Sequence, residues 1–235
     1  LAEVALCDAK KITKKPEELS FAEAAAMPTT YLTSYQALRD HGFQEGGKLL
    51  VIGASGGCGT AGIQLGVSMG AQEIVGVCSK KNEQLVLDSG ATRIIDYQTQ
   101  NALEVCGKEY FDFVYDAATA SGKGENYTKM ARDLLKPPDP DNGIGMYVAI
   151  NGRIGAWTRS LLKLENKSNR LLQVKHSQQD LQSILDLLHK EPNALHYRPI
   201  IDRTLPFDRQ NVLQGFQHLK SRRATGKIVF EIHPK

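Results

Sequence analysis

A buried strand that runs straight into a glycine cluster is the feature that most constrains this chain. Residues 49–52 read Leu-Leu-Val-Ile, and residues 53–59 read Gly-Ala-Ser-Gly-Gly-Cys-Gly. An uninterrupted apolar run is typical of a strand buried on both faces of a parallel sheet. Residues 60–70 are mostly small or apolar, and they predict a helix. A strand, a glycine turn and a helix in this order favour a site where backbone N–H groups hold a phosphate.

The glycines match the dinucleotide-binding pattern G-x-G-x-x-G at its second and third positions. Ala54 stands at the first position, and Gly56 and Gly59 stand at the other two. Gly56 would let the backbone approach a pyrophosphate, and Gly59 would let the helix pack close to the strand. A glycine-rich turn that binds nothing would match equally well, so the interpretation depends on the segments that follow.

Short apolar segments and helical patterns alternate along most of the chain. We expect strands within residues 2–7, 49–52, 73–77, 93–95, 111–115, 146–150, 171–174, 199–201 and 227–232. We expect helices within residues 22–27, 29–38, 60–70, 83–87, 103–106, 127–135, 181–188 and 209–219. Ser20 and Glu23 form a capping box before the first helix, and Asp208 can cap the last one. This alternation predicts an α/β fold with a doubly wound parallel sheet.

The charge balance and the cysteines argue against several classes of function. The chain has 235 residues, of which 29 are basic and 26 acidic, and its net charge is +3. This balance argues against nucleic acid or an anionic membrane as a partner, and no apolar run approaches the roughly 20 residues of a membrane-spanning helix. The four cysteines lack C-x-x-C spacing, which argues against a zinc lobe or a disulfide framework. We therefore expect an intracellular protein of the cytoplasm or an organelle, with a transit peptide still compatible because the chain does not begin with Met.

The end of the second strand bears on the choice of dinucleotide. An NAD site usually has an acidic residue about 20 residues past the glycines, where it binds the ribose. Here Val77 is followed by Cys-Ser-Lys-Lys, with no carboxylate. Ser79 could donate a hydrogen bond to a 2′-phosphate, and Lys80 and Lys81 could offset its charge, which favours NADPH over NADH. Tyr97 could close over the same phosphate. A solvated lysine turn and a half-buried packing tyrosine are the alternatives.

Several segments resemble the medium-chain dehydrogenase/reductase superfamily. Residues 24–28 and 32–38, Ala-Ala-Ala-Met-Pro and Leu-Thr-Ser-Tyr-Gln-Ala-Leu, resemble the segment before its cofactor domain. Residues 53–59, 89–97 and 223–229 are similar to its quinone oxidoreductase branch, in particular to the reticulon-4-interacting and chloroplast-envelope quinone oxidoreductase type. These similarities extend over nearly the whole chain.

The resemblance implies a domain organisation and an activity. Residues 1–19 would be a remnant of a GroES-like catalytic domain, residues 20–198 a Rossmann domain, and residues 199–235 the return to the catalytic domain, whose N-terminal part would be mostly missing. The implied activity is zinc-independent hydride transfer from NADPH to small quinones or α,β-unsaturated carbonyl compounds. We expect the chain to be only weakly active by itself. A homodimer through the sixth strand, near Leu171–Val174, is also implied.

The resemblance also assigns cofactor contacts by motif. The pyrophosphate would be held by Ala54, Ser55, Gly56, Gly57 and Cys58. The 2′-phosphate would be held by Ser79, Lys80, Lys81 and Tyr97. The nicotinamide side would be lined by Thr33, Ala117, Ala118 and Asn151, and Arg223 would touch the adenosine ribose. No metal ligands are implied, and no residue stands out as a catalytic acid or nucleophile.

Two other functions are compatible with the sequence. One is an enoyl-thioester reductase, and the other is a non-catalytic dinucleotide-binding module that serves in protein or RNA interaction. NADPH binding, followed by an NADPH oxidation assay, would discriminate between them. The polar turn Pro137–Gly143 is longer than typical for the family and receives no role from the sequence.

Overall fold

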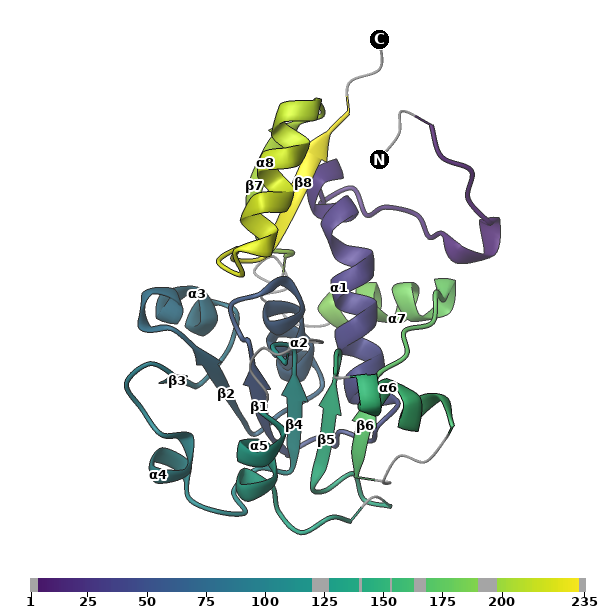
Figure 1. Ribbon diagram of the computed structural model, residues 1–235. Coiled ribbons are helices and arrows are strands. Elements are labelled where there is room, and N and C mark those ends of the chain that lie inside the picture. Colours follow the sequence, from purple (N-terminus) through teal and green to yellow (C-terminus); the bar gives the residue numbers. More distant parts are fainter. Residues whose placement is uncertain are drawn as a thin grey trace.

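Two parallel sheets organise the fold (Figure 1). The computed structural model describes residues 4–119, 127–139, 141–152, 154–162, 168–189 and 198–232. The larger sheet contains β1 (Lys48–Ile52), β2 (Glu73–Cys78), β3 (Arg93–Asp96), β4 (Phe113–Asp116), β5 (Met146–Ala149) and β6 (Asn169–Leu171). Its order is β3-β2-β1-β4-β5-β6, and every neighbouring pair is parallel. This is the strand order of the dinucleotide-binding doubly wound fold, so the predicted fold class is confirmed.

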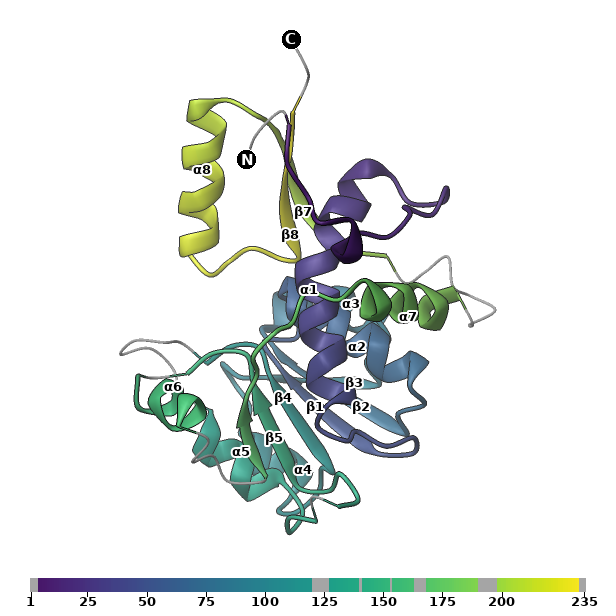
Figure 2. The same ribbon diagram turned by 90° about the vertical axis from the view of Figure 1, so that its right-hand side faces the viewer.

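Both faces of the larger sheet are buried under helices (Figure 2). Leu49 and Val51 point into a core shared with α1 (Phe21–Arg39), α2 (Gly57–Ser68), α3 (Glu83–Asp88) and α7 (Gln178–His189). Leu50 and Ile52 point into a second core, shared with α4 (Ala102–Cys106) and α5 (Thr128–Leu134). Alternate side chains of a strand face opposite sides, which explains why the central strand is apolar at every position after Lys48. Helix α6 (Ile154–Leu161), which the sequence did not predict, contacts β6.

Helix α1 is a single helix, and the predicted break at Pro28 is wrong. The capping box at its start is confirmed: the Ser20 hydroxyl accepts a bond from Glu23 N, and Ser20 N donates to the Glu23 carboxylate. Pro28 removes one backbone hydrogen bond from a helix interior. However, every residue from 30 to 38 is buried, and α1 packs against α2, α7 and both strands of the smaller sheet. This packing outweighs the lost bond.

The smaller sheet is built by the last part of the chain. β7 (Ile201–Pro206) and β8 (Lys227–Glu231) pair in parallel, and α8 (Arg209–Lys220) connects them. The predicted cap is confirmed, because the Asp208 side chain accepts a hydrogen bond from Asn211 N. Both strands also contact α1, so this unit lies beside that helix in Figure 1. The division at residues 19 and 198 stays a prediction.

The strands predicted near both ends of the chain and at the edge of the larger sheet differ from the observed ones. Residues 4–7 form no strand, and residues 2 and 3 of that predicted strand lie outside the described part. The sixth strand ends at Leu171 rather than beginning there. After it, Gln36 of α1 bonds both Lys175 N and Lys175 O, which draws the chain away from the sheet. β7 starts at Ile201 and is longer than predicted. Within the described residues, no helix is both long and apolar enough to cross a bilayer.

Candidate cofactor-binding site

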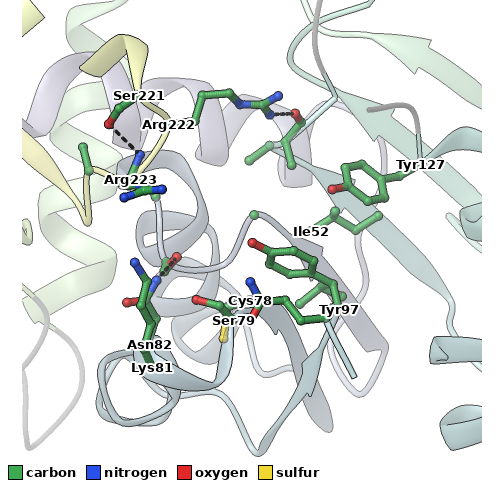
Figure 3. Close-up of a pocket in the computed structure, with 18 residues that line it drawn as sticks. Ile52, Cys78, Ser79, Lys81, Asn82, Tyr97, Tyr127, Ser221, Arg222 and Arg223 are labelled. Carbon is green, nitrogen blue, oxygen red and sulfur yellow. Dashed lines mark hydrogen bonds between the residues drawn. The ribbon is translucent and has the colours of Figure 1, made fainter. Parts of the chain in front are cut away.

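A pocket of about 670 Å³ opens where β1, β2 and β4 end (Figure 3). β1 lies between β2 and β4, so the strand order reverses at this point. Open α/β sheets bind their ligands in the crevice at such a reversal. One side of the pocket is formed by the turns after the strands, and the other side by the loop between α8 and β8.

The glycine turn after β1 is fixed by the backbone of β2. Gly53 has a φ of +77°, a conformation that suits glycine, and the N–H groups of Gly53 and Ala54 both donate to Val77 O. A Cβ on Gly59 would overlap Gly53 O and lie 2.7 Å from Ala54 Cα. Gly59 therefore allows α2 to start directly against the turn, as the sequence predicts.

The start of α2 suits an anionic ligand. Helix starts carry backbone N–H groups without partners in the helix, and the helix dipole favours negative charge there. In the described structure no side chain caps α2, whereas α1 has its capping box. A Cβ on Gly56 would make only an ordinary contact, 3.4 Å from Gly53 O. The turn thus leaves space for a phosphate at the helix start, and the residues present fit a dinucleotide.

Predicted residues from four separate turns, after β1, β2, β3 and β4, and from one distant loop lie together in this pocket. Those that line it are Ser55, Gly56, Ser79, Lys81, Tyr97, Ala117, Ala118 and Arg223. Figure 3 shows Lys81 and Tyr97 on the side opposite Arg222 and Arg223. Three of the described lining residues are cationic: Lys81, Arg222 and Arg223. The described lining contains no Asp or Glu. The charge of the pocket therefore favours an anion.

The two neighbouring lysines behave differently. Lys80 Nζ lies 2.6 Å from Glu83 Oε2, its side chain is largely exposed, and it does not line the pocket. Lys81 lines the pocket. The sequence treats the two as equivalent, because both follow β2 directly. The structure brings only Lys81 to the candidate phosphate site.

Other predicted residues lie away from the described pocket lining. They are Thr33, Ala54, Gly57, Cys58, Lys80 and Asn151. Thr33 is buried and donates to Thr29 O within its own helix, at 2.6 Å. Asn151 accepts a bond from Gly152 N. Ala54 is fully buried, and Cys58 is a half-buried thiol whose pKa is raised by burial. Their assignment to cofactor binding stays a prediction.

The sequence missed several pocket residues. Asn82 Nδ2 donates to Ser55 Oγ at 3.0 Å and so ties the turn after β2 to the glycine turn. The Arg222 guanidinium donates to Ala118 O, which joins the α8–β8 loop to the loop after β4. Asn82 follows Lys81 and Arg222 precedes Arg223 in the sequence. This adjacency to predicted site residues is the one sequence feature that could have indicated their place in the pocket.

A buried carboxylate organises the loop after β4. Asp116 accepts hydrogen bonds from Ala118 N and Thr119 N at 2.9 Å each, and from the Thr119 hydroxyl. Tyr147 OH donates to the same carboxylate at 2.6 Å. Burial, together with the charge of Asp116, raises the pKa of Tyr147, which keeps this phenol protonated as a donor. The backbone of residues 117–118 is therefore held in place at the pocket.

Comparison with known proteins identifies the family. The sequence profile of the zinc-binding dehydrogenase family matches residues 89–230, which is more than half of the chain. The chain belongs to the zinc-binding dehydrogenase family. This confirms the predicted membership of the medium-chain dehydrogenase/reductase superfamily and its quinone oxidoreductase-like branch.

Curated relatives match the chain over nearly its whole length. A 2-methylene-furan-3-one reductase of Solanum lycopersicum is 32% identical over 235 residues, which are 100% of this chain and 52% of that protein. The mitochondrial NAD(P)H oxidoreductase RTN4IP1 of Mus musculus is 28% identical over 250 residues, covering 99% of this chain and 61% of that protein. The chain thus spans about half to three fifths of the length of these relatives.

A solved structure shows the same fold. The quinone oxidoreductase from Coxiella burnetii superposes with a TM-score of 0.73 at 23% identity, covering 94% of this chain and 64% of that one. Although the family is named after zinc, the described residues contain no group of three or more His, Cys, Asp or Glu side chains placed to hold a metal ion.

Proposed function

We propose that the pocket binds NADPH and that the chain is the cofactor-binding part of a reductase. The observation that carries this proposal is the charge of the pocket. Lys81, Arg222 and Arg223 line it, and its described lining contains no carboxylate at the position where an NAD site has one. A 2′-phosphate would meet cationic donors there, with charge-assisted hydrogen bonds.

The residues of this chain would bind and orient the dinucleotide. The uncapped start of α2 and Gly56 would receive the pyrophosphate. Ser79, Lys81 and Arg223 would receive the 2′-phosphate. On the nicotinamide side, Asp116 would hold the backbone of residues 117–118 through its bonds to Ala118 N and Thr119 N. When bound, the cofactor itself would supply the hydride.

The substrate class that we propose is quinones or α,β-unsaturated carbonyl compounds. It is supported by the tomato relative, whose name describes the reduction of an alkene conjugated to a carbonyl group. We further propose that the reaction needs no zinc and that two chains associate through the sheet edge at β6, residues 169–171. Stoichiometric zinc in the active protein would refute the first of these, and a monomer in light scattering the second.

Binding and turnover test the proposal separately. Purified protein is titrated with NADPH and NADH, and NADPH oxidation is then followed with a quinone, an enone and an enoyl thioester. We expect tighter binding of NADPH than of NADH, and weak oxidation with the quinone or the enone, because the chain is only the cofactor-binding part. Oxidation with the thioester alone would make the protein an enoyl-thioester reductase. Binding without any oxidation would favour a non-catalytic module, and no binding would refute the site.

A further inference from the structure

The loop between α8 and β8 enters the cofactor pocket from the smaller sheet. Residues 221–225, here named the return loop, place Ser221, Arg222, Arg223 and Ala224 in the pocket lining. In the described lining, this loop supplies two of the three cationic residues. Its position therefore matters for the recognition of an anion.

A β-bulge in β7 aims a carboxylate at this loop. Ile201 pairs with Lys227 and Arg203 pairs with Ile228, so Asp202 is an extra residue between two successive pairs. Bulges re-aim a side chain and are frequent next to active sites. Here Asp202 Oδ1 accepts hydrogen bonds from Thr225 N at 3.2 Å and from Thr225 Oγ1 at 2.8 Å.

The same carboxylate also binds the end of α8. His218 Nε2 lies 2.7 Å from Asp202 Oδ2, and Nε2 must carry the hydrogen because a carboxylate only accepts. Burial opposes the charge of Asp202, but the bonds from Thr225 and His218 outweigh it and lower the pKa of the carboxyl. Asp202 is thus an anion at neutral pH that joins β7, the last turn of α8 and the end of the return loop.

Two further bonds connect the return loop, and the glycine that follows it, to the turns after β1 and β4. Gly226 N donates to Ser55 O at 3.2 Å, and the Arg222 guanidinium donates to Ala118 O. Arg222 has a φ of 58°, in the left-handed region that non-glycine residues rarely adopt. Such a conformation persists where the surroundings fix it. The bonds of Asp202 to Thr225 are part of those surroundings, three residues further along the chain.

We propose that Asp202 is a positioning residue for cofactor recognition, which holds the return loop through Thr225 so that Arg223 meets the 2′-phosphate. The inference rests on the NADPH site proposed above. Asp202 is absent from the described pocket lining, so it acts through the loop. Its loss lets the loop move, and the bond between a loosened arginine and the phosphate weakens. NADH lacks the 2′-phosphate, so its affinity depends little on Asp202.

The test compares variants by calorimetric titration with NADPH and with NADH. For Asp202→Ala and for Thr225→Val, we expect the NADPH affinity to fall about tenfold and the NADH affinity to stay within about twofold, as for one charge-assisted hydrogen bond. Thr225→Ser keeps the hydroxyl that bonds to Asp202, so its NADPH affinity should equal that of the wild type. In Thr225→Val, the backbone N–H of residue 225 can still donate to Asp202. This variant therefore remains informative if Asp202→Ala does not fold.

A matched control separates positioning from stability. Asp208→Ala removes the cap of α8 in the same unit, without touching the return loop, and should leave the ratio of the two affinities unchanged. In an Arg223→Ala background, Asp202→Ala should cause no further loss of NADPH affinity, because it acts through that arginine.

The outcomes distinguish the inference from the function on which it rests. If wild-type protein prefers NADPH and neither Asp202→Ala nor Thr225→Val changes that preference, the inference is wrong and the NADPH site stands. Equal losses for both dinucleotides, or full additivity with Arg223→Ala, would also overturn it. If the wild-type protein binds neither dinucleotide, the proposed function fails and the inference fails with it.

Discussion

The two sides of the pocket are held in place by different kinds of interaction. On the sheet side, backbone hydrogen bonds from Gly53 and Ala54 to Val77 O fix the glycine turn, next to fully buried strands. On the side of the return loop, side chains provide most of the anchors: Asp202 binds Thr225, and Arg222 binds Ala118 O. The loop residues around these anchors are largely exposed.

Because of this difference, we expect substitutions on the sheet side to change stability and substitutions in the return loop to change ligand affinity. The sheet side forms together with the two hydrophobic cores, so a change there should cost stability. The return loop adds little buried apolar surface, so a change there should alter ligand affinity while the fold persists. The following variants test that contrast, from the largest expected effect to the smallest.

The largest effect is expected at Gly59. In Gly59→Ala, the new methyl group would overlap the backbone of Gly53 and Ala54. The overlap can be relieved only if the glycine turn moves. We expect the free energy of unfolding to fall by more than about 3 kcal/mol in urea denaturation. Gly56→Ala is the matched control, since its methyl group has room, and it should change stability by less than about 1 kcal/mol.

The two glycines also differ in what they do for the ligand. Gly56→Val should keep the fold and weaken NADPH and NADH alike, because its side chain would occupy the place of the pyrophosphate. If Gly59→Ala is as stable as wild type, the close packing of α2 against the turn is not what fixes this side of the pocket.

The next effect concerns the two lysines after β2. Lys81→Ala should weaken NADPH about ten- to hundredfold and leave NADH nearly unchanged, because a charge-assisted hydrogen bond contributes about 1.5–3 kcal/mol. Lys80→Ala is the control, as Lys80 pairs with Glu83 and does not line the pocket. Calorimetric titration measures both. The NADPH preference should shrink as salt rises, because the site is open to solvent.

Equal losses for Lys80→Ala and Lys81→Ala would contradict this placement and point to a diffuse charge effect. A loss that is the same for both dinucleotides would indicate a folding defect.

The smallest effect is expected for Arg222→Ala. The variant removes the bond to Ala118 O, which is exposed, so the free energy of unfolding should fall by about 0.5–1 kcal/mol. Thermal denaturation, compared with that of Gly59→Ala, measures it. A loss as large as that of Gly59→Ala would show that the return loop is part of the folding core and would remove the contrast between the two sides.

Local signals in the sequence predicted the sheet side of the pocket. These signals are the apolar run before Gly53, the glycines of the turn and the position of Lys81 after β2. Each depends on residues that are neighbours in the chain, so each can be recognised from a short stretch of sequence. Pro28 misled the prediction because tertiary packing outweighed a local helix breaker. The sixth strand was misplaced because contacts of Gln36 with Lys175, 139 positions away, set where it ends.

The return loop could not be predicted in the same way. The bond from Arg222 reaches Ala118, 104 positions earlier, and Asp202 meets Thr225 only because a bulge turns its side chain. Neither pairing leaves a periodic pattern in the sequence. Likewise, nothing in the local sequence indicates that Lys80 pairs with Glu83 while Lys81 lines the pocket.

The central claim is that this pocket recognises a 2′-phosphate, and half of the dinucleotide suffices to test it. Calorimetry of the protein with adenosine 2′,5′-bisphosphate and with adenosine 5′-monophosphate compares ligands that differ in that phosphate alone. We expect the bisphosphate to bind at least about tenfold more tightly, and Lys81→Ala to abolish most of the difference. Equal affinities for the two nucleotides in wild-type protein would contradict the claim.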